Sequence, residues 1–264
     1  NVALRERLKA YRYNPKEFTT IKTQSGLELN AWIVKPIDFD PSRHYPVLMV
    51  QYSGPNSQQV LDRYSFDWEH YLASKGYVVA CVDGRGTGAR GEEWRKCTYM
   101  QLGVFESDDQ IAAATAIGQL PYVDAARIGI WGWSYGGYTT LMSLCRGNGT
   151  FKAGIAVAPV ADWRFYDSVY TERFMRTPKE NASGYKMSSA LDVASQLQGN
   201  LLIVSGSADD NVHLQNTMLF TEALVQANIP FDMAIYMDKN HSIYGGNTRY
   251  HLYTRKAKFL FDNL

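Results

Sequence analysis

The sequence predicts an α/β fold: a mostly parallel, doubly wound sheet of about eight strands with helices on both faces. Short apolar runs of strand type alternate along the chain with longer segments of helical pattern. The central runs are almost continuously apolar, which is typical of strands buried on both faces of a parallel sheet. The length of 264 residues suits one large domain of this class.

The pattern places the elements in the following order. Residues 1–17 are charged and indicate a short helix or linker, and residues 18–264 form the domain, which starts with a hairpin. The expected strands are residues 18–23, 27–34, 47–51, 77–82, 127–131, 153–158, 201–205 and 231–237. The expected helices are residues 66–75, 107–120 with Ser107 as its cap, a segment after Ser134, 212–227 and 248–264.

Composition excludes several function classes. The net charge is +1 and no basic run stands out, which argues against a nucleic-acid partner. No apolar stretch reaches the roughly 18 residues of a membrane span. Cys81, Cys97 and Cys145 fit no zinc spacing or disulfide framework, and we interpret Cys81 and Cys145 as core residues. We expect no metal and no cofactor. The chain begins with Asn1 rather than Met, so we expect a processed or excised chain.

The clearest chemical signal surrounds Ser134. A strand pattern leads into Gly132-Trp133-Ser134-Tyr135-Gly136, and a helix-capable segment follows. G-x-S-x-G between a strand and a helix is typical of a nucleophile elbow, in which a strained turn lifts the serine hydroxyl above the sheet. The alternative is a glycine-rich turn that happens to hold a serine, and the strand–turn–helix context disfavours it. Ser134 is therefore the predicted nucleophile.

A serine nucleophile needs a base, which in α/β-hydrolase folds comes last in the chain order serine, acid, histidine. His241 lies between the last expected strand and the last expected helix, which is where the base belongs. His213 and His251 fall on expected helices and are weaker candidates. We expect activity to fall when the imidazole of the base is protonated.

The base needs an orienting carboxylate, and two adjacent acids follow the strand at 201–205. Asp209 is the preferred acid. Acids ahead of a helix often serve as N-caps, a role that Asp210 or Asn211 could fill. Ser134, Asp209 and His241 together predict the catalytic triad of an α/β-hydrolase fold.

Negative charge that develops on a substrate oxygen requires hydrogen-bond donors. Tyr135 directly follows the nucleophile and offers its backbone N–H. Tyr52 begins the loop after the strand at 47–51 and offers its hydroxyl, although a tyrosine at a strand end is more often a packing residue.

Residues 86–91 match G-x-G-x-x-G and follow a strand, which raises the question of a dinucleotide site. The next segment is highly charged and lacks an apolar helical face, and Asp108 begins a helix rather than ending a second strand. The glycines are better interpreted as a tight loop beneath the site.

Several stretches resemble the catalytic domain of the prolyl oligopeptidase family, most closely its dipeptidyl peptidases. They are residues 83–86, 132–138, 156–160, 166–173 and 208–213. They run in the family's order from about residue 52 to the end of the chain. Each is weak alone, but together they are specific.

The resemblance implies the same triad and the same two oxyanion donors. It also implies an apolar pocket for the residue before the cleaved bond, usually proline or alanine, lined by Tyr135, Val160, Trp163, Tyr166, Tyr170 and Val212. Asn211 would bind the carbonyl of that residue. Spacing alone favours a different interpretation, in which three of these aromatic residues share one helix face at i, i+3 and i+7.

The implied function is a serine peptidase that releases dipeptides through an acyl-enzyme. An esterase or acylaminoacyl hydrolase on the same scaffold is one alternative, and a fragment inactive by itself is another. Members of the family carry a β-propeller, which nothing in this chain resembles, so specificity for a free amino terminus should come from outside it. Ser242 follows His241 where the family usually has glycine. A homodimer through the last helices and a secreted or periplasmic parent protein are further implications.

Overall fold

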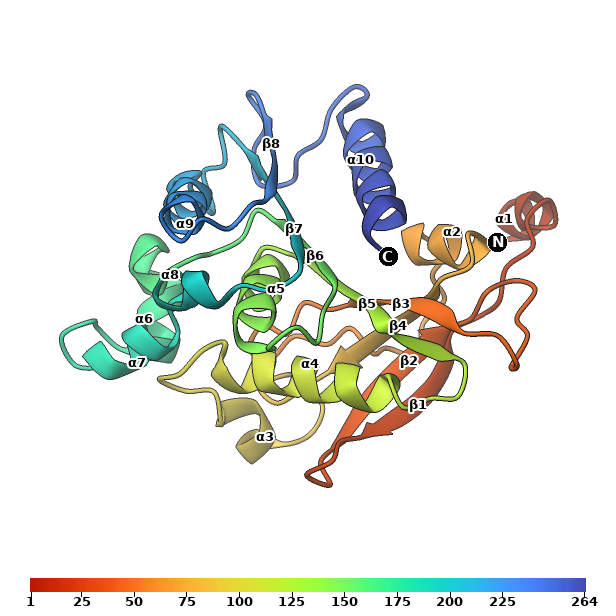
Figure 1. Cartoon of the computed structure of the whole chain (residues 1–264), viewed down its shortest axis with the longest axis horizontal. Coiled ribbons are helices and arrows are strands. Elements are labelled where there is room, and N and C mark those ends of the chain that lie inside the picture. The colour runs from red at the N-terminus through yellow and green to blue at the C-terminus, as the bar shows by residue number, and fades with distance from the viewer.

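The computed structural model describes residues 1–264 and contains one sheet of eight strands in the order β1-β2-β4-β3-β5-β6-β7-β8. β1 pairs antiparallel with β2, and β2 pairs antiparallel with β4, whereas the other neighbours are parallel. The strands are Glu17–Lys22, Glu28–Val34, Tyr45–Val50, Val78–Asp83, Val123–Trp133, Ala153–Val157, Asn200–Gly206 and Asp232–Tyr236. The predicted mostly parallel α/β fold is confirmed (Figure 1).

Helices cover both faces of the sheet. α2 and α10 pack on one face, and α4, α5, α8 and α9 pack on the other (Figure 1). The α-helices α1 to α10 are Val2–Leu8, Trp68–Ser74, Glu92–Lys96, Val104–Ile117, Tyr135–Arg146, Ser168–Met175, Ala182–Met187, Ala190–Val193, Gln215–Gln226 and Thr248–Asn263. Two 3₁₀ helices, η1 and η2, are Trp163–Phe165 and Ala194–Gln196. None of the helices combines the length and apolarity that a bilayer span requires.

The apolar side chains form one buried cluster on each face of the sheet. The larger cluster has 38 residues and lies under α4, α5 and α9, and the smaller has 20 residues and lies under α2 and α10. The central strands β4 and β6 are buried along their whole length, which explains why both are apolar apart from Asp83 at the end of β4.

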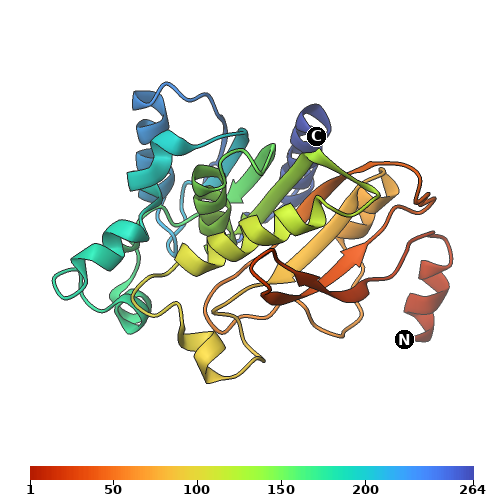
Figure 2. The ribbon, with the colours of Figure 1, turned by 60° about the horizontal axis from the view of Figure 1, so that its bottom comes forward.

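Parallel strands bring their carboxyl ends to one edge of the sheet. β3, β5, β6, β7 and β8 are consecutive parallel neighbours, so the segments that follow them meet at that edge (Figure 2). In open α/β sheets this edge is where reactive groups gather. The segments after β3, β5, β7 and β8 carry Tyr52, Ser134, Asp209 and His241.

Three predicted starts differ from the structure by three residues or more, each for a local reason. α4 begins at Val104, since Gly103 has the φ of +80° that sets the entry to the helix, and Ser107 lies inside it with its hydroxyl on the Gly103 carbonyl. β5 begins at Val123 because its early residues pair with β3 at Tyr45. α9 begins at Gln215, not at residue 212, and residues 207–214 form turns ahead of it.

Candidate active site

Ser134 stands between β5 and α5 in a conformation that side chains rarely adopt. Its φ is +60° and ψ is −117°, and α5 begins at the next residue, Tyr135. The Ser134 backbone N–H donates to the Val157 carbonyl at the end of β6, 2.8 Å away. Held strain of this kind clusters at functional sites. The strand, the sharp turn and the helix form the elbow that the sequence predicts.

Both glycines of the motif are required by close backbone approaches. A Cβ at Gly132 would lie 2.4 Å from the Gly136 backbone, and a Cβ at Gly136 would lie 2.6 Å from the Gln51 carbonyl oxygen. The Gln51 side chain, at the end of β3, also donates to the Gly136 carbonyl at 2.7 Å. These contacts lock the elbow against the neighbouring strand.

Asp209 and His241 meet at the same edge of the sheet. His241 Nδ1 lies 2.8 Å from Asp209 Oδ2, and the Asp209 side chain is fully buried. The other carboxylate oxygen of Asp209 accepts the backbone N–H groups of Asn211 and Val212. Asp209 therefore shapes its own turn and also contacts the imidazole. Neither Asp210 nor Asn211 caps α9, whose N-cap residue Leu214 makes no side-chain cap bond.

The loop that carries His241 is fixed by two contacts. Trp133, next to the nucleophile, donates its indole N–H to the His241 carbonyl at 3.0 Å. The backbone of Gly206 passes so close to Lys239 that a Cβ there would lie 2.1 Å from the Lys239 carbonyl oxygen. The structure has no hydrogen bond between Ser134 and His241, whose Nδ1 faces Asp209. Such catalytic contacts are often long before substrate binds.

The two predicted oxyanion donors flank Ser134. Burial raises the pKa of the Tyr52 hydroxyl, and the nearby Ser134 side chain acts in the opposite direction. Tyr135 is the first residue of α5, so its backbone N–H has no partner within the helix. The rings of Tyr52 and Tyr135 lie 6.1 Å apart between centroids.

The predicted pocket residues gather beside Tyr135. The Trp163 ring lies 5.3 Å from the Tyr135 ring and is stacked on the Tyr170 ring at 5.9 Å. The Tyr166 ring meets Tyr170 edge-on, and its hydroxyl donates to the Asn211 side chain at 2.6 Å. Val160 and Val212 are buried in the same cluster.

These aromatic residues do not lie on one helix, contrary to the interpretation that spacing alone favours. Trp163 belongs to η1, Tyr166 ends that element, and Tyr170 lies in α6. η1 and α6 each have their own N-cap. The side chains of Asp162 and Asp167 accept backbone N–H groups at the starts of η1 and α6, respectively. The break turns the three rings toward a common point.

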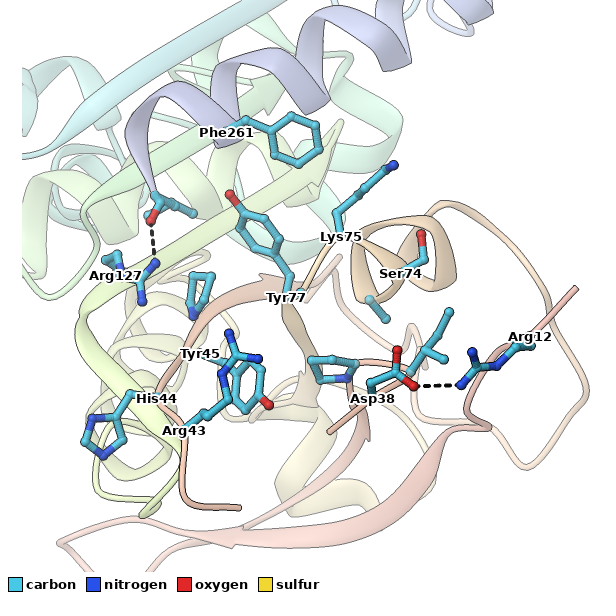
Figure 3. Close-up of a pocket in the computed structure, with 16 residues that line it drawn as sticks. Arg12, Asp38, Arg43, His44, Tyr45, Ser74, Lys75, Tyr77, Arg127 and Phe261 are labelled. Atoms are coloured by element: carbon cyan, nitrogen blue, oxygen red, sulfur yellow. Dashed lines mark hydrogen bonds and ion pairs between the residues drawn. The ribbon is translucent and has the colours of Figure 1, made fainter. Parts of the chain in front are cut away.

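A hollow of about 760 Å³ opens in front of His241, lined also by Tyr166, Asn211 and His213. A second hollow, of about 630 Å³, lies near the start of β3 and the end of α10 (Figure 3). Its basic side chains include Arg12, which pairs with Asp38 at 2.6 Å. It lies at the opposite edge of the sheet from Ser134, so it takes no part in this site.

The remaining sequence candidates lie outside the site or beside it. His251 is in α10, where its Nδ1 is 2.8 Å from the Tyr236 hydroxyl. His213 lies in the turn before α9 rather than in the helix. In the G-x-G-x-x-G stretch, residues 86–91 form a loop, and the helix that follows has five residues.

Sequence reasoning missed Glu106, which lies on the buried side of α4. Its carboxylate accepts the Tyr135 hydroxyl at 2.7 Å. Burial raises its pKa to about 7, although the hydrogen bond from Tyr135 opposes the shift. Glu106 lies just before the helix expected at residues 107–120, so the helical pattern gave no signal for it, and acidic residues are rarely buried in full.

Comparison with known proteins shows which family this chain belongs to. The sequence pattern of the prolyl oligopeptidase family matches residues 64–264. The chain belongs to the prolyl oligopeptidase family. It is 99% identical, with a TM-score of 0.99, to part of the crystal structure of Porphyromonas gingivalis dipeptidyl peptidase 4, covering 100% of this chain and 38% of that one.

Curated members of the prolyl oligopeptidase family give the same picture. The chain is 45% identical to a probable dipeptidyl-aminopeptidase B of Phaeosphaeria nodorum over 98% of its own length and 29% of the relative. It is 50% identical to a protein of the same name from Grosmannia clavigera, over 89% of its length and 24% of the relative. The chain thus spans less than two fifths of the proteins it matches.

Proposed function

We propose that this chain is the catalytic domain of a serine dipeptidyl peptidase, which releases dipeptides ending in proline or alanine through an acyl-enzyme. The observation that carries the proposal is the 2.8 Å contact between Asp209 and His241 at the sheet edge where the elbow presents Ser134. The names of its relatives, dipeptidyl peptidase 4 and dipeptidyl-aminopeptidase B, support the reaction class.

Each residue has a role that its position supports. His241 Nε2 takes the proton of the Ser134 hydroxyl while the Ser134 oxygen bonds to the scissile carbonyl carbon. Asp209 holds the imidazole by Nδ1 and stabilises its protonated form. The Tyr52 hydroxyl and the Tyr135 N–H stabilise the oxyanion. His241 then gives the proton to the departing amine, and water releases the acyl group by the same steps in reverse order.

The aromatic pocket supports a flat, rigid residue before the cleaved bond. The rings of Tyr135, Trp163 and Tyr170 present extended apolar walls whose side chains are held by one another. A proline ring has little conformational entropy to lose there and gains contact area. Asn211, whose side-chain oxygen accepts the Tyr166 hydroxyl, would bind a substrate carbonyl through its amide N–H, and this hydrogen bond supports that role.

Two substrates and one covalent probe test the proposal. A fluorophosphonate should label the wild-type protein and not Ser134→Ala. A Gly-Pro anilide should be cleaved faster than a short acyl ester. Labelling with preference for the ester would instead establish the esterase or acylaminoacyl-hydrolase alternative. Absence of labelling in the full-length protein that contains this chain would refute a serine mechanism.

We also propose that the parent protein holds a further propeller domain that selects substrates with a free amino terminus, and that it is secreted or periplasmic. The 38% coverage of the Porphyromonas gingivalis structure supports a larger parent. Cleavage by the 264-residue chain and by the full-length protein should be compared on free and N-acetylated Gly-Pro anilides. A strong preference for the free substrate only in the full-length protein is the expected result.

A homodimer through the last elements is proposed as well. Apolar side chains exposed on α9, β8 and the loops nearby support it; they are Met218, Leu219, Val225, Met233 and Met237. Sedimentation should give a dimer for the wild-type protein, and Val225→Glu should shift it toward the monomer. A wild-type monomer at micromolar concentration would contradict the proposal.

A further inference from the structure

Glu106 is a fully buried carboxyl group, and one of its two oxygens has no hydrogen-bond partner. Oε1 accepts the Tyr135 hydroxyl at 2.7 Å, and Oε2 has no partner. Burying a carboxyl with an unpaired oxygen destabilises a fold, since the water it loses is not replaced. The position therefore calls for an explanation other than packing.

The partner of Glu106 is the residue that joins the proposed oxyanion hole to the proposed pocket. Tyr135 supplies the backbone N–H next to Ser134, and its ring packs between Tyr52 and Trp163. Its hydroxyl makes its one hydrogen bond with Glu106. Glu106 therefore holds the hydroxyl end of the Tyr135 side chain, while the backbone of Tyr135 lies next to Ser134, the proposed nucleophile.

We propose that Glu106 is a positioning residue of the peptidase: its carboxylate holds the Tyr135 side chain, and through it the pocket wall and the oxyanion N–H, in the reactive arrangement. The inference rests on the proposed function, because it assigns Glu106 a role in that same site. It extends the site inward to α4, an element that contributes no group to the substrate itself.

The protonation state of Glu106 sets the strength of this anchor. A hydrogen bond to an ionised carboxylate is about twice as strong as one to a neutral acid. Burial raises the pKa of Glu106 to about 7, against the lowering effect of the Tyr135 hydroxyl. Below that pH the unpartnered Oε2 takes up the proton, and Oε1 remains a weaker, neutral acceptor. The anchor strengthens as the pH rises through about 7.

Burial keeps the thiol and the phenol groups around Glu106 neutral near pH 7. The groups that face it are Asp109 with its partner Arg85, Cys97, Tyr135, Tyr138 and Tyr170. Burial raises the pKa of Cys97 and of each of the three tyrosines, so they stay neutral. Asp109 pairs with Arg85, with 2.6 Å between Oδ1 and the guanidinium, and its proximity adds to the rise in the pKa of Glu106.

The test is the pH profile of kcat/KM for Gly-Pro anilide in the full-length protein. Wild type should show a further rise of about tenfold near pH 7, in addition to any pH dependence that the Glu106 variant retains. Glu106→Gln keeps the size and an acceptor oxygen but cannot ionise, so it should lose the further rise. Its kcat/KM should fall about tenfold at alkaline pH and approach wild type at acid pH. Glu93→Gln, an exposed site of the same type, should match wild type throughout.

A double-mutant cycle separates positioning from a general structural effect. Tyr135→Phe removes the hydroxyl and should also lose the further rise, and Glu106→Gln should add little to it. Independent, additive losses would overturn the inference, and so would a Tyr135→Phe profile identical to wild type. The second variant keeps the test decisive even where Glu106→Gln fails to fold.

The same proteins separate this inference from the proposed function. Fluorophosphonate labelling of Ser134 and anilide cleavage by wild type report on the function. Active wild type with an unchanged Glu106→Gln profile overturns only the role of Glu106. Wild type that neither labels nor cleaves overturns both. Infrared difference spectra should also show a buried carboxyl that titrates near pH 7 in wild type and is absent in Glu106→Gln.

Discussion

Asp209 makes hydrogen bonds through both carboxylate oxygens, and this double use limits what can replace it. One oxygen accepts the N–H groups of Asn211 and Val212, and the other contacts the imidazole of His241. The first pair of bonds fixes the direction of the second. A substitution that keeps the two backbone hydrogen bonds but removes the negative charge of Asp209 therefore separates the two roles of its carboxylate.

Asp209→Asn should leave the turn in place and lower kcat about 10³–10⁴-fold. The asparagine oxygen can keep the two backbone bonds, but its amide then faces Nδ1 and favours the wrong tautomer of His241. Steady-state kinetics on Gly-Pro anilide measure the loss. Asp210→Asn is the matched control, and a larger loss there than at Asp209 would show that the acid has been misassigned.

Tyr52→Phe should lower kcat about 10²-fold with little change in KM. The hydroxyl beside Ser134 is needed when negative charge develops on the substrate oxygen, whereas the ring packs equally well without it. An unchanged kcat would show that Tyr52 has only a packing role.

At the scale of elements, the elbow depends on three backbone segments meeting within van der Waals distance. The end of β3, the end of β5 and the start of α5 touch at Gln51, Gly132 and Gly136. No side-chain rearrangement can relieve a contact between backbones. The glycines that the local turn requires are therefore also the residues that the packing of β3 against the elbow requires.

Gly132→Ala should lower the free energy of unfolding by about 1–3 kcal/mol and abolish fluorophosphonate labelling. The added Cβ would lie 2.4 Å from the Gly136 backbone. Gly118→Ala is the control, because its φ is −60° and its closest new contact is the Ala125 side chain at 3.3 Å. Chemical denaturation gives the stabilities, and a fully labelled Gly132→Ala protein would contradict this account of the elbow.

At the scale of the molecule, the cluster under α2 and α10 contains one fully buried lysine. Lys256 Nζ has no hydrogen-bond partner and lies 3.2 Å from the Trp131 ring centroid, with Trp68 and Tyr253 close by. Burial lowers the pKa of Lys256 well below its ordinary value, and Glu69 opposes the shift. Contact of a cation with aromatic rings contributes up to about 2 kcal/mol, less than the several kcal/mol that burying a charge costs.

Lys256→Met should therefore raise the free energy of unfolding at pH 7, by about 1–3 kcal/mol. The unfolded chain binds a proton that the folded chain resists, so the stability of wild type relative to the variant should rise with pH up to the unfolded pKa of about 10.4. Urea denaturation of both proteins at several pH values measures the difference. A less stable variant at every pH would show that the aromatic contacts outweigh burial of the charge.

The sequence determined the order and type of the main elements and the chemistry of the site. Continuous apolar runs predict strands that are buried on both faces. The G-x-S-x-G motif identifies Ser134 because its two glycines allow the close backbone contacts of the turn. Helix starts were less predictable. Gly103 and the turn at Asp209 set the starts of α4 and α9 through backbone geometry that residue type alone does not reveal.

Only the tertiary structure decided which distant side chains meet. Parallel strand order brings Asp209 and His241 to 2.8 Å across 32 residues of chain. A break between η1 and α6 turns Trp163, Tyr166 and Tyr170 together, and the packing of α4 on α5 puts Glu106 on Tyr135. Periodicity records which face of an element is apolar, but not which element covers it. Contacts between elements arise from that covering, and so does the burial of the ionisable side chains of Glu106 and Lys256.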